Sequence, residues 1–115
     1  MKIITAAAFL AILLASCAGP ITGVSVRNAN FDVVKTLTPS ELPEFTRLWD
    51  SKEQVDVERK KVGGTHFKLD IMRTNRDGRW LYWSTGYVWL LDVFPHPVYR
   101  IREPEAFNRL IGALE

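Results

Sequence analysis

The chain has 115 residues, one cysteine and a formal net charge of +2 at pH 7. Its length fits one small domain, and 15 Lys and Arg against 13 Asp and Glu are too balanced for a nucleic-acid-binding protein. A lone cysteine excludes an internal disulfide, so the four Trp, three Tyr and six Phe are expected to provide the packing.

The first sixteen residues have the layout of a secretory signal peptide. Lys2 gives a positive start, residues 3–15 form an apolar run broken only by Thr5, and small residues close it. The run is shorter than the roughly 20 apolar residues of a membrane-spanning helix. It also lacks the polar face of a helix that packs on a soluble core. We therefore expect residues 1–16 to be removed from the mature protein.

The closing segment Leu14-Ala15-Ser16-Cys17 resembles the lipobox of bacterial lipoproteins. The resemblance covers only the first seventeen residues. It implies cleavage just before Cys17, a diacylglycerol on the Cys17 thiol and acylation of the new amino group. The alternative for Cys17 is an ordinary buried thiol.

The small body and its Trp and Arg content are similar to those of small envelope lipoproteins of Gram-negative bacteria. In that family, a residue other than Asp after the cysteine implies sorting to the outer membrane, and here that residue is Ala18. The resemblance therefore implies a lipid-anchored protein of the bacterial outer membrane whose domain faces the periplasm.

Residues 17–23 are expected to form the lipidated cysteine and a short tether, followed by a single α+β domain over residues 24–115. Apolar residues at alternating positions predict a strand from Val24 through Val34. The alternation changes face near residues 28–30, and a bulge or bend would account for the change.

A helix is predicted to follow Thr38. Thr38 can cap it, with Pro39 at the first helical position and Glu41 three residues after the cap. Because Pro43 lacks an N–H group, the regular part could begin only there. The predicted buried stripe consists of Leu42, Phe45, Leu48 and Trp49. Residues 50–64 are polar and predict a surface loop.

The centre of the sheet is predicted over residues 65–83. Apolar and polar side chains alternate over residues 66–71, and an aromatic strand follows over residues 79–83. Between them, Asn75 and Gly78 fit the first and fourth positions of a type I turn that ends in a left-handed glycine. We therefore expect a hairpin with a three-residue loop.

The length of this loop decides which aromatic side chains face the core, because a one-residue shift in pairing turns a strand over. A three-residue loop pairs Ile71 with Trp83 on the inner face. Trp80 and Tyr82 then share the outer face with Met72.

Residues 86–94 match helical spacing but also fit a buried strand. We favour a short helix, because Pro95 and Pro97 would end it. Residues 98–101 predict the last strand, and Pro104 opens a final helix with apolar residues at helical spacing. These residues are Phe107, Leu110, Ile111 and Leu114. The elements together predict an α+β fold, with a small antiparallel sheet of about four strands packed against two or three helices.

The sequence contains no Gly-rich phosphate loop, no nucleophile elbow and no Cys or His pattern for a metal. We therefore expect a protein that is not an enzyme and needs no cofactor or metal. The alternative is a hydrolase of envelope polymer that uses His66 or Asp70 as its acid or base. Residues four apart on a strand lie about 13 Å from each other, so these two need a bend to act together.

The candidate binding site is the outer aromatic face of the predicted hairpin. Aromatic rings beside arginines suit recognition of a glycan or another envelope protein, although a helix could instead cover this face. The residues expected to contribute are Trp80, Tyr82, Met72, Arg73, Arg79 and Trp89. The basic run Arg59-Lys60-Lys61 is either a solvated loop or, on a membrane-tethered protein, a contact with anionic lipid headgroups. The sequence thus predicts a non-catalytic binding or structural accessory of the envelope.

Overall fold

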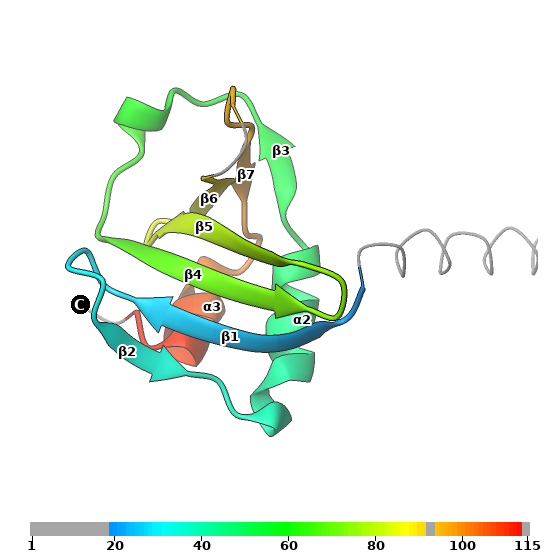
Figure 1. The fold of residues 1–115 in the computed structure, drawn as a ribbon. Coiled ribbons are helices and arrows are strands. Elements are labelled where there is room, and N and C mark those ends of the chain that lie inside the picture. The colour runs from blue at the N-terminus through cyan, green and yellow to red at the C-terminus, as the bar shows by residue number, and fades with distance from the viewer. Residues whose placement is uncertain (1–18, 92–93, 114–115) are drawn as a thin grey trace, which may run out of the picture.

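The computed structural model describes residues 19–91 and 94–113, which form one antiparallel sheet and two α-helices (Figure 1). The predicted signal peptide and Cys17 lie outside the described residues. The strands are β1 (Ile21–Arg27), β2 (Val33–Thr36), β3 (Glu53–Val55), β4 (His66–Arg73), β5 (Asp77–Trp83), β6 (Tyr87–Leu90) and β7 (Val98–Arg100). The helices are α2 (Leu42–Asp50) and α3 (Pro104–Ile111), with short 3₁₀ helices η1 (Pro39–Glu41) and η2 (Arg59–Lys61).

The predicted α+β class is confirmed, but the sheet is larger than the four strands expected. Its seven strands lie in the order β2-β1-β4-β5-β6-β7-β3. The two edges are short strands, and β3 falls inside the segment 50–64 that was expected to be a loop throughout. Because Glu53-Gln54-Val55 has no apolar alternation, its sequence carries no strand signal of its own.

The principal core lies between one face of the sheet and the two helices (Figure 1). Phe107 of α3 is at its centre and is fully buried. Its ring lies 4.9 Å from that of Tyr82 in β5 and 5.4 Å from that of Phe45 in α2. Aromatic packing of this kind joins both helices to the sheet.

A second, smaller cluster covers the opposite face of the sheet. Its buried residues are Val62, Trp89 and Val98, and Leu81 and Trp83 pack against them. Val62 comes from the connection between β3 and β4, so this connection is a cover for the sheet as well as a link.

The single strand predicted through Val34 is wrong, because the chain reverses and forms the β1–β2 hairpin. The Asn28 side-chain oxygen accepts the backbone N–H groups of Asn30 at 2.9 Å and Asp32 at 3.0 Å. Asparagine bonds of this kind stabilise turns in competition with strands. β1 also begins at Ile21, three residues before Val24, where the first strand was expected to begin.

The predicted helix start is confirmed in its chemistry. The Thr38 N–H donates to Glu41 Oε1 at 2.9 Å, as a capping box requires. The first turn is 3₁₀, and the α-helix begins at Leu42, so Pro43 lies in the first turn where its missing N–H is tolerated. The predicted stripe is buried at Phe45, Leu48 and Trp49, and Leu42 packs against the core at its edge.

The predicted register of the β4–β5 hairpin is wrong. Ile71 pairs with Gly78 instead of Trp83, a displacement of five residues. The turn is tighter than expected, because the Arg73 N–H donates to the Arg76 carbonyl at 2.9 Å. Since five is odd, the opposite face of β5 meets the core.

Trp80 and Tyr82 consequently point towards the helices. Tyr82 is fully buried and Trp80 packs against the principal core, whereas Leu81 and Trp83 join the second cluster. The expected outer aromatic face is therefore the inner face of the strand.

The helix favoured over residues 86–94 is also wrong, since Tyr87–Leu90 is strand β6 between β5 and β7. Val88 faces the principal core and Trp89 the second cluster. A strand buried on both faces reads as a continuous apolar run, so its period does not distinguish it from a helix.

The predicted last strand and final helix are present as β7 and α3. Phe107 and Ile111 are buried and Leu110 packs against the core, as the helical spacing indicates. Leu114 lies outside the described residues.

Candidate ligand-binding pocket

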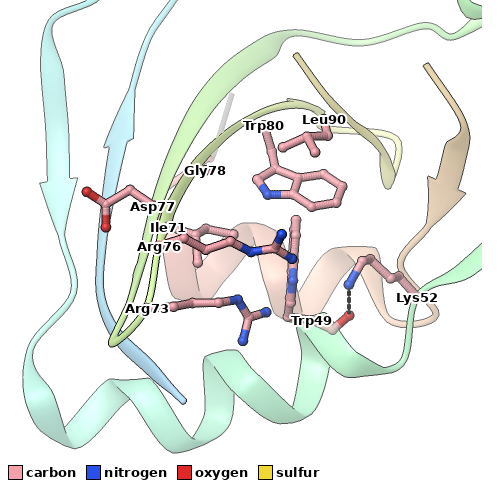
Figure 2. Close-up of a pocket in the computed structure, with 9 residues that line it drawn as sticks. All are labelled: Trp49, Lys52, Ile71, Arg73, Arg76, Asp77, Gly78, Trp80 and Leu90. Atoms are coloured by element: carbon pink, nitrogen blue, oxygen red, sulfur yellow. Dashed lines mark hydrogen bonds between the residues drawn. The ribbon is translucent and has the colours of Figure 1, made fainter. Parts of the chain in front are cut away.

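A pocket of about 300 Å³ lies between the end of α2 and the β4–β5 hairpin (Figure 2). Trp49 and Lys52 line it on the helix side, and Trp80 lines it from β5. Arg73 and Arg76 come from either side of the hairpin turn. The pocket therefore combines two indole rings with three cationic side chains.

The two indoles form its apolar wall. Trp49 is fully buried, and its ring meets the partly buried Trp80 edge to face, with centroids 4.9 Å apart and planes at 88°. This arrangement is favourable for aromatic pairs and fixes both rings. Because α2 and β5 are both anchored in the principal core, the wall is held by the rigid part of the fold.

The Lys52 ammonium lies among three aromatic rings. Its Nζ is 4.3 Å from the ring centroid of Trp49, 5.5 Å from that of Trp80 and 5.9 Å from that of Tyr99. These distances fall within the range of cation–π attraction. Nζ also donates to the Trp49 carbonyl at 3.4 Å, which holds the side chain against the end of the helix.

The charge of Lys52 is destabilised by its surroundings. Burial lowers the pKa of Lys52 to about 8, the carboxylate of Asp50 acts against this shift, and the positive charge of Arg73 adds to it. The influence of Arg73 means that the two cations share one electrostatic environment.

The two arginines approach from the side opposite Lys52, and both extend towards Trp49 (Figure 2). Arg73 Nη1 donates to the Gly19 carbonyl at 2.6 Å, so part of this guanidinium is fixed by the backbone. Arg76 is exposed. Within residues 19–91 and 94–113, none of the three cations forms an ion pair with a carboxylate.

Several other cations of the domain are paired with carboxylates. The Nε atoms of Arg27 and Arg79 lie 3.0 Å and 2.6 Å from the carboxylate oxygens of Asp70, and Arg102 is paired with Glu53. The pocket contains one carboxylate, Asp77, against three cations. Its net charge is therefore positive.

This arrangement can bind a small anion. Guanidinium groups donate parallel hydrogen bonds to two oxygens of a carboxylate or phosphate. The partly buried indole of Trp80, which the fully buried ring of Trp49 meets edge to face, would contact an apolar or ring-shaped part of the same ligand. The pocket volume is at the lower end for small-molecule sites, so it suits a single anionic group on a compact body.

The structure brings Trp80 and Arg73 of the six predicted binding residues into this pocket. Tyr82 instead lies in the core, where its hydroxyl donates to Asn108 Oδ1 and burial raises its pKa. Trp89 is buried in the second cluster.

Met72 and Arg79 lie on the outer face of the sheet. Met72 is exposed, and Arg79 forms two hydrogen bonds to Asp70, at 2.6 Å and 3.1 Å. The predicted site residues do not form one face, because the register that would align them is not the register of the hairpin.

The two candidate catalytic residues have structural partners. The hydrogen bonds from Arg79, with the one from Arg27, hold the pKa of Asp70 below its usual range, which favours the charged carboxylate over a general acid. The His66 ring packs 5.0 Å from that of Trp83. In the part of the chain that the structure describes, no three His, Cys, Asp or Glu side chains are placed to hold a metal ion.

The predicted binding residues omit three of the aromatic and cationic residues that line the pocket, Trp49, Arg76 and Lys52, and the sequence suggested no role at all for Lys52. Its signal is weak: a lysine three residues after a core tryptophan, just beyond the end of a helix. Only the packing of that helix end beside the hairpin turn reveals that Lys52 and the two arginines share a pocket.

Comparison with known protein families, curated proteins and solved structures found no match for this chain. Among the described residues, no helix has the length and apolar character needed to cross a membrane.

Proposed function

We propose that this protein is a lipid-anchored lipoprotein of the bacterial envelope and acts as a non-catalytic binding accessory through the pocket between α2 and the β4–β5 hairpin. The segment Leu14-Ala15-Ser16-Cys17 supports the anchor, and Ala18 supports the periplasmic face of the outer membrane. The binding role is carried by one observation. Three cations that lack a carboxylate partner in the described chain converge on two indoles.

The convergence of three cations on one pocket costs free energy in the absence of an anion. Like charges in one partly buried space repel, and the lowered pKa of Lys52 expresses both burial and this repulsion. A bound anion removes the repulsion and supplies the missing hydrogen-bond acceptors. An acidic glycan or a carboxylate of another envelope protein would provide such an anion.

Anion binding can be tested with glucuronate and glycerol phosphate as probes, followed by tryptophan fluorescence, because Trp49 and Trp80 both line the pocket. We expect the paired substitutions Arg73→Gln and Arg76→Gln to weaken binding at least about tenfold, since hydrogen bonds to charged groups contribute about 1.5–3 kcal/mol. The pair Lys60→Gln and Lys61→Gln removes the same charge from an exposed site and is the control. Equal losses of anion affinity in the two doubly substituted variants would show that the anion is attracted by the overall charge of the domain and not bound at this pocket.

The anchor can be tested by mass spectrometry of the membrane fraction. We expect a mature chain that begins at Cys17 and carries acyl chains, because each buried CH₂ contributes about 0.8 kcal/mol and two or more chains hold a protein stably at a membrane. The variant Cys17→Ser should be neither acylated nor membrane-bound. A native mature chain that is soluble, unmodified or begins elsewhere would refute the anchor.

A further inference from the structure

The pocket lies at the end of the domain where the chain enters from the proposed anchor. The Gly19 carbonyl accepts the bond from Arg73 at 2.6 Å. A Cβ atom at Gly19 would lie 2.8 Å from side-chain oxygens of both Thr74 and Asn75, so the chain at Gly19 lies directly against the hairpin turn. Figure 1 shows the chain entering β1 beside this turn and α2.

The distance from Gly19 to the anchor is short. Cys17 precedes Gly19 by two residues, and two extended residues span at most about 7 Å. Acyl chains on Cys17 would therefore hold the hairpin turn at the membrane surface. Arg73 and Arg76, which flank that turn, would then lie at the depth of the lipid headgroups.

From this placement we infer that the pocket binds the phosphate of an anionic phospholipid in the membrane that holds Cys17. The inference rests on the proposed function, both for the anchor and for the anionic ligand. A phosphodiester offers two non-bridging oxygens, which share one negative charge, to the guanidinium groups of Arg73 and Arg76. Its glycerol body would lie against Trp80, and tryptophan side chains favour the headgroup level of membranes.

The other basic segment is placed differently. The run Arg59–Lys61 forms η2, which precedes the start of β4, whereas the anchor lies beside the end of β4. The eight residues of this strand extend over roughly 25 Å. The Nζ atoms of Lys60 and Lys61 also lie 3.8 Å and 3.9 Å from Oε2 of Glu58. The pocket, and not this run, is the basic site next to the membrane.

Bound lipid at the pocket would add a second point of attachment to the acyl chains. With two attachments the domain has a fixed orientation, in which the hairpin turn faces the membrane and η2 points away from it. This orientation follows from the fold, since Gly19 and the turn are joined by the Arg73 hydrogen bond.

The experiment uses the full lipidated protein in micelles of a neutral detergent, with tryptophan fluorescence as the readout. Three probes are compared: short-chain phosphatidylglycerol in the micelle, glycerophosphoglycerol in solution and inorganic phosphate. We expect saturable binding of phosphatidylglycerol. The double variant Arg73→Gln, Arg76→Gln should bind this lipid about 30-fold more weakly. Each basic side chain at a membrane surface contributes about fivefold to the affinity, and the variant lacks two.

Two variants make the result specific. Lys60→Gln with Lys61→Gln should change the affinity less than twofold, and Arg76→Gln alone should weaken binding about fivefold without touching the Gly19 hydrogen bond. Binding of the two soluble probes without binding of phosphatidylglycerol would overturn the lipid inference and leave the anion pocket intact. No binding of any probe would overturn both, and equal losses in the two charge pairs would overturn a specific lipid site.

Discussion

Phe107→Ala is expected to reduce the free energy of unfolding by about 3–5 kcal/mol, which is typical of truncating a buried phenylalanine. Phe107 is fully buried and contacts rings from α2 and β5, with centroids 5.4 Å away for Phe45, 6.2 Å for Trp49 and 4.9 Å for Tyr82. The neighbours of Phe107 are held by the sheet and by α2, so they can fill only part of the cavity that Phe107→Ala leaves. Small domains are stable by about 5–15 kcal/mol, and this loss would therefore be a large fraction of the total.

Urea denaturation followed by circular dichroism measures this change, with the m-value as a check that both variants unfold in the same way. Phe94→Ala is the matched control, because the Phe94 side chain is 83% exposed. We expect the control to alter stability by no more than about 0.5 kcal/mol. Equal effects of the two substitutions would contradict the central position of Phe107 in the core.

Helices of this fold could be predicted because their signals are local. Thr38 and Glu41 are three residues apart and form the capping box that their spacing indicates. The apolar stripes of α2 and α3 need only a 3.6-residue period, and each stripe lies in the core. The α+β class followed from these helices and from the alternation in β4.

The strand register could not be predicted, because two turn geometries compete for the same residues. Asn75 and Gly78 fit a three-residue loop, yet the closing hydrogen bond runs from Arg73 to the Arg76 carbonyl. A shift of five residues on β5 reverses its two faces, so one local choice misplaces Trp80 and Tyr82 together. Side-chain packing on the helices decides between the turns, and that information is not local.

The pocket depends on contacts between distant parts of the chain. Trp49 and Lys52 lie at the end of α2, more than twenty residues before Arg73 and Arg76. The sequence indicated Trp80 and Arg73 as binding residues, but as part of an aromatic outer face of the hairpin and not of a pocket beside α2. Their true neighbours follow from the side of the sheet on which α2 packs.

Lys52→Met is expected to stabilise the domain at pH 7 and to weaken anion binding. Burial lowers the pKa of Lys52 to about 8 from an ordinary value of 10.5, which corresponds to about 3 kcal/mol against the charged form. Partial solvation of the ammonium reduces this penalty, and the cation–π contact with Trp49 offsets about 0.5–1 kcal/mol. The remaining gain is about 1–2 kcal/mol, since methionine packs well against indole rings.

The sign of the pH dependence follows from proton binding. Between pH 8 and 10.5 the unfolded native chain binds more protons at Lys52 than the folded chain does, so the stability of the native protein rises with pH in this window. The variant lacks this rise. Its advantage in stability should therefore be greatest near pH 7 and shrink towards pH 10.5.

The two effects separate a functional lysine from a structural one. Denaturation of both proteins at pH 7 and pH 10 gives the stability difference, and Lys60→Met is the control because its side chain is 82% exposed. Phosphatidylglycerol suits the binding measurement, since its phosphodiester keeps its charge over this range. We expect its affinity for the native protein to fall above pH 8 as Lys52 loses its proton, and to be low and independent of pH in the variant. A variant that binds the lipid as well as the native protein does would show that Lys52 does not serve the pocket, and a variant that is less stable at pH 7 would contradict the expected stabilisation.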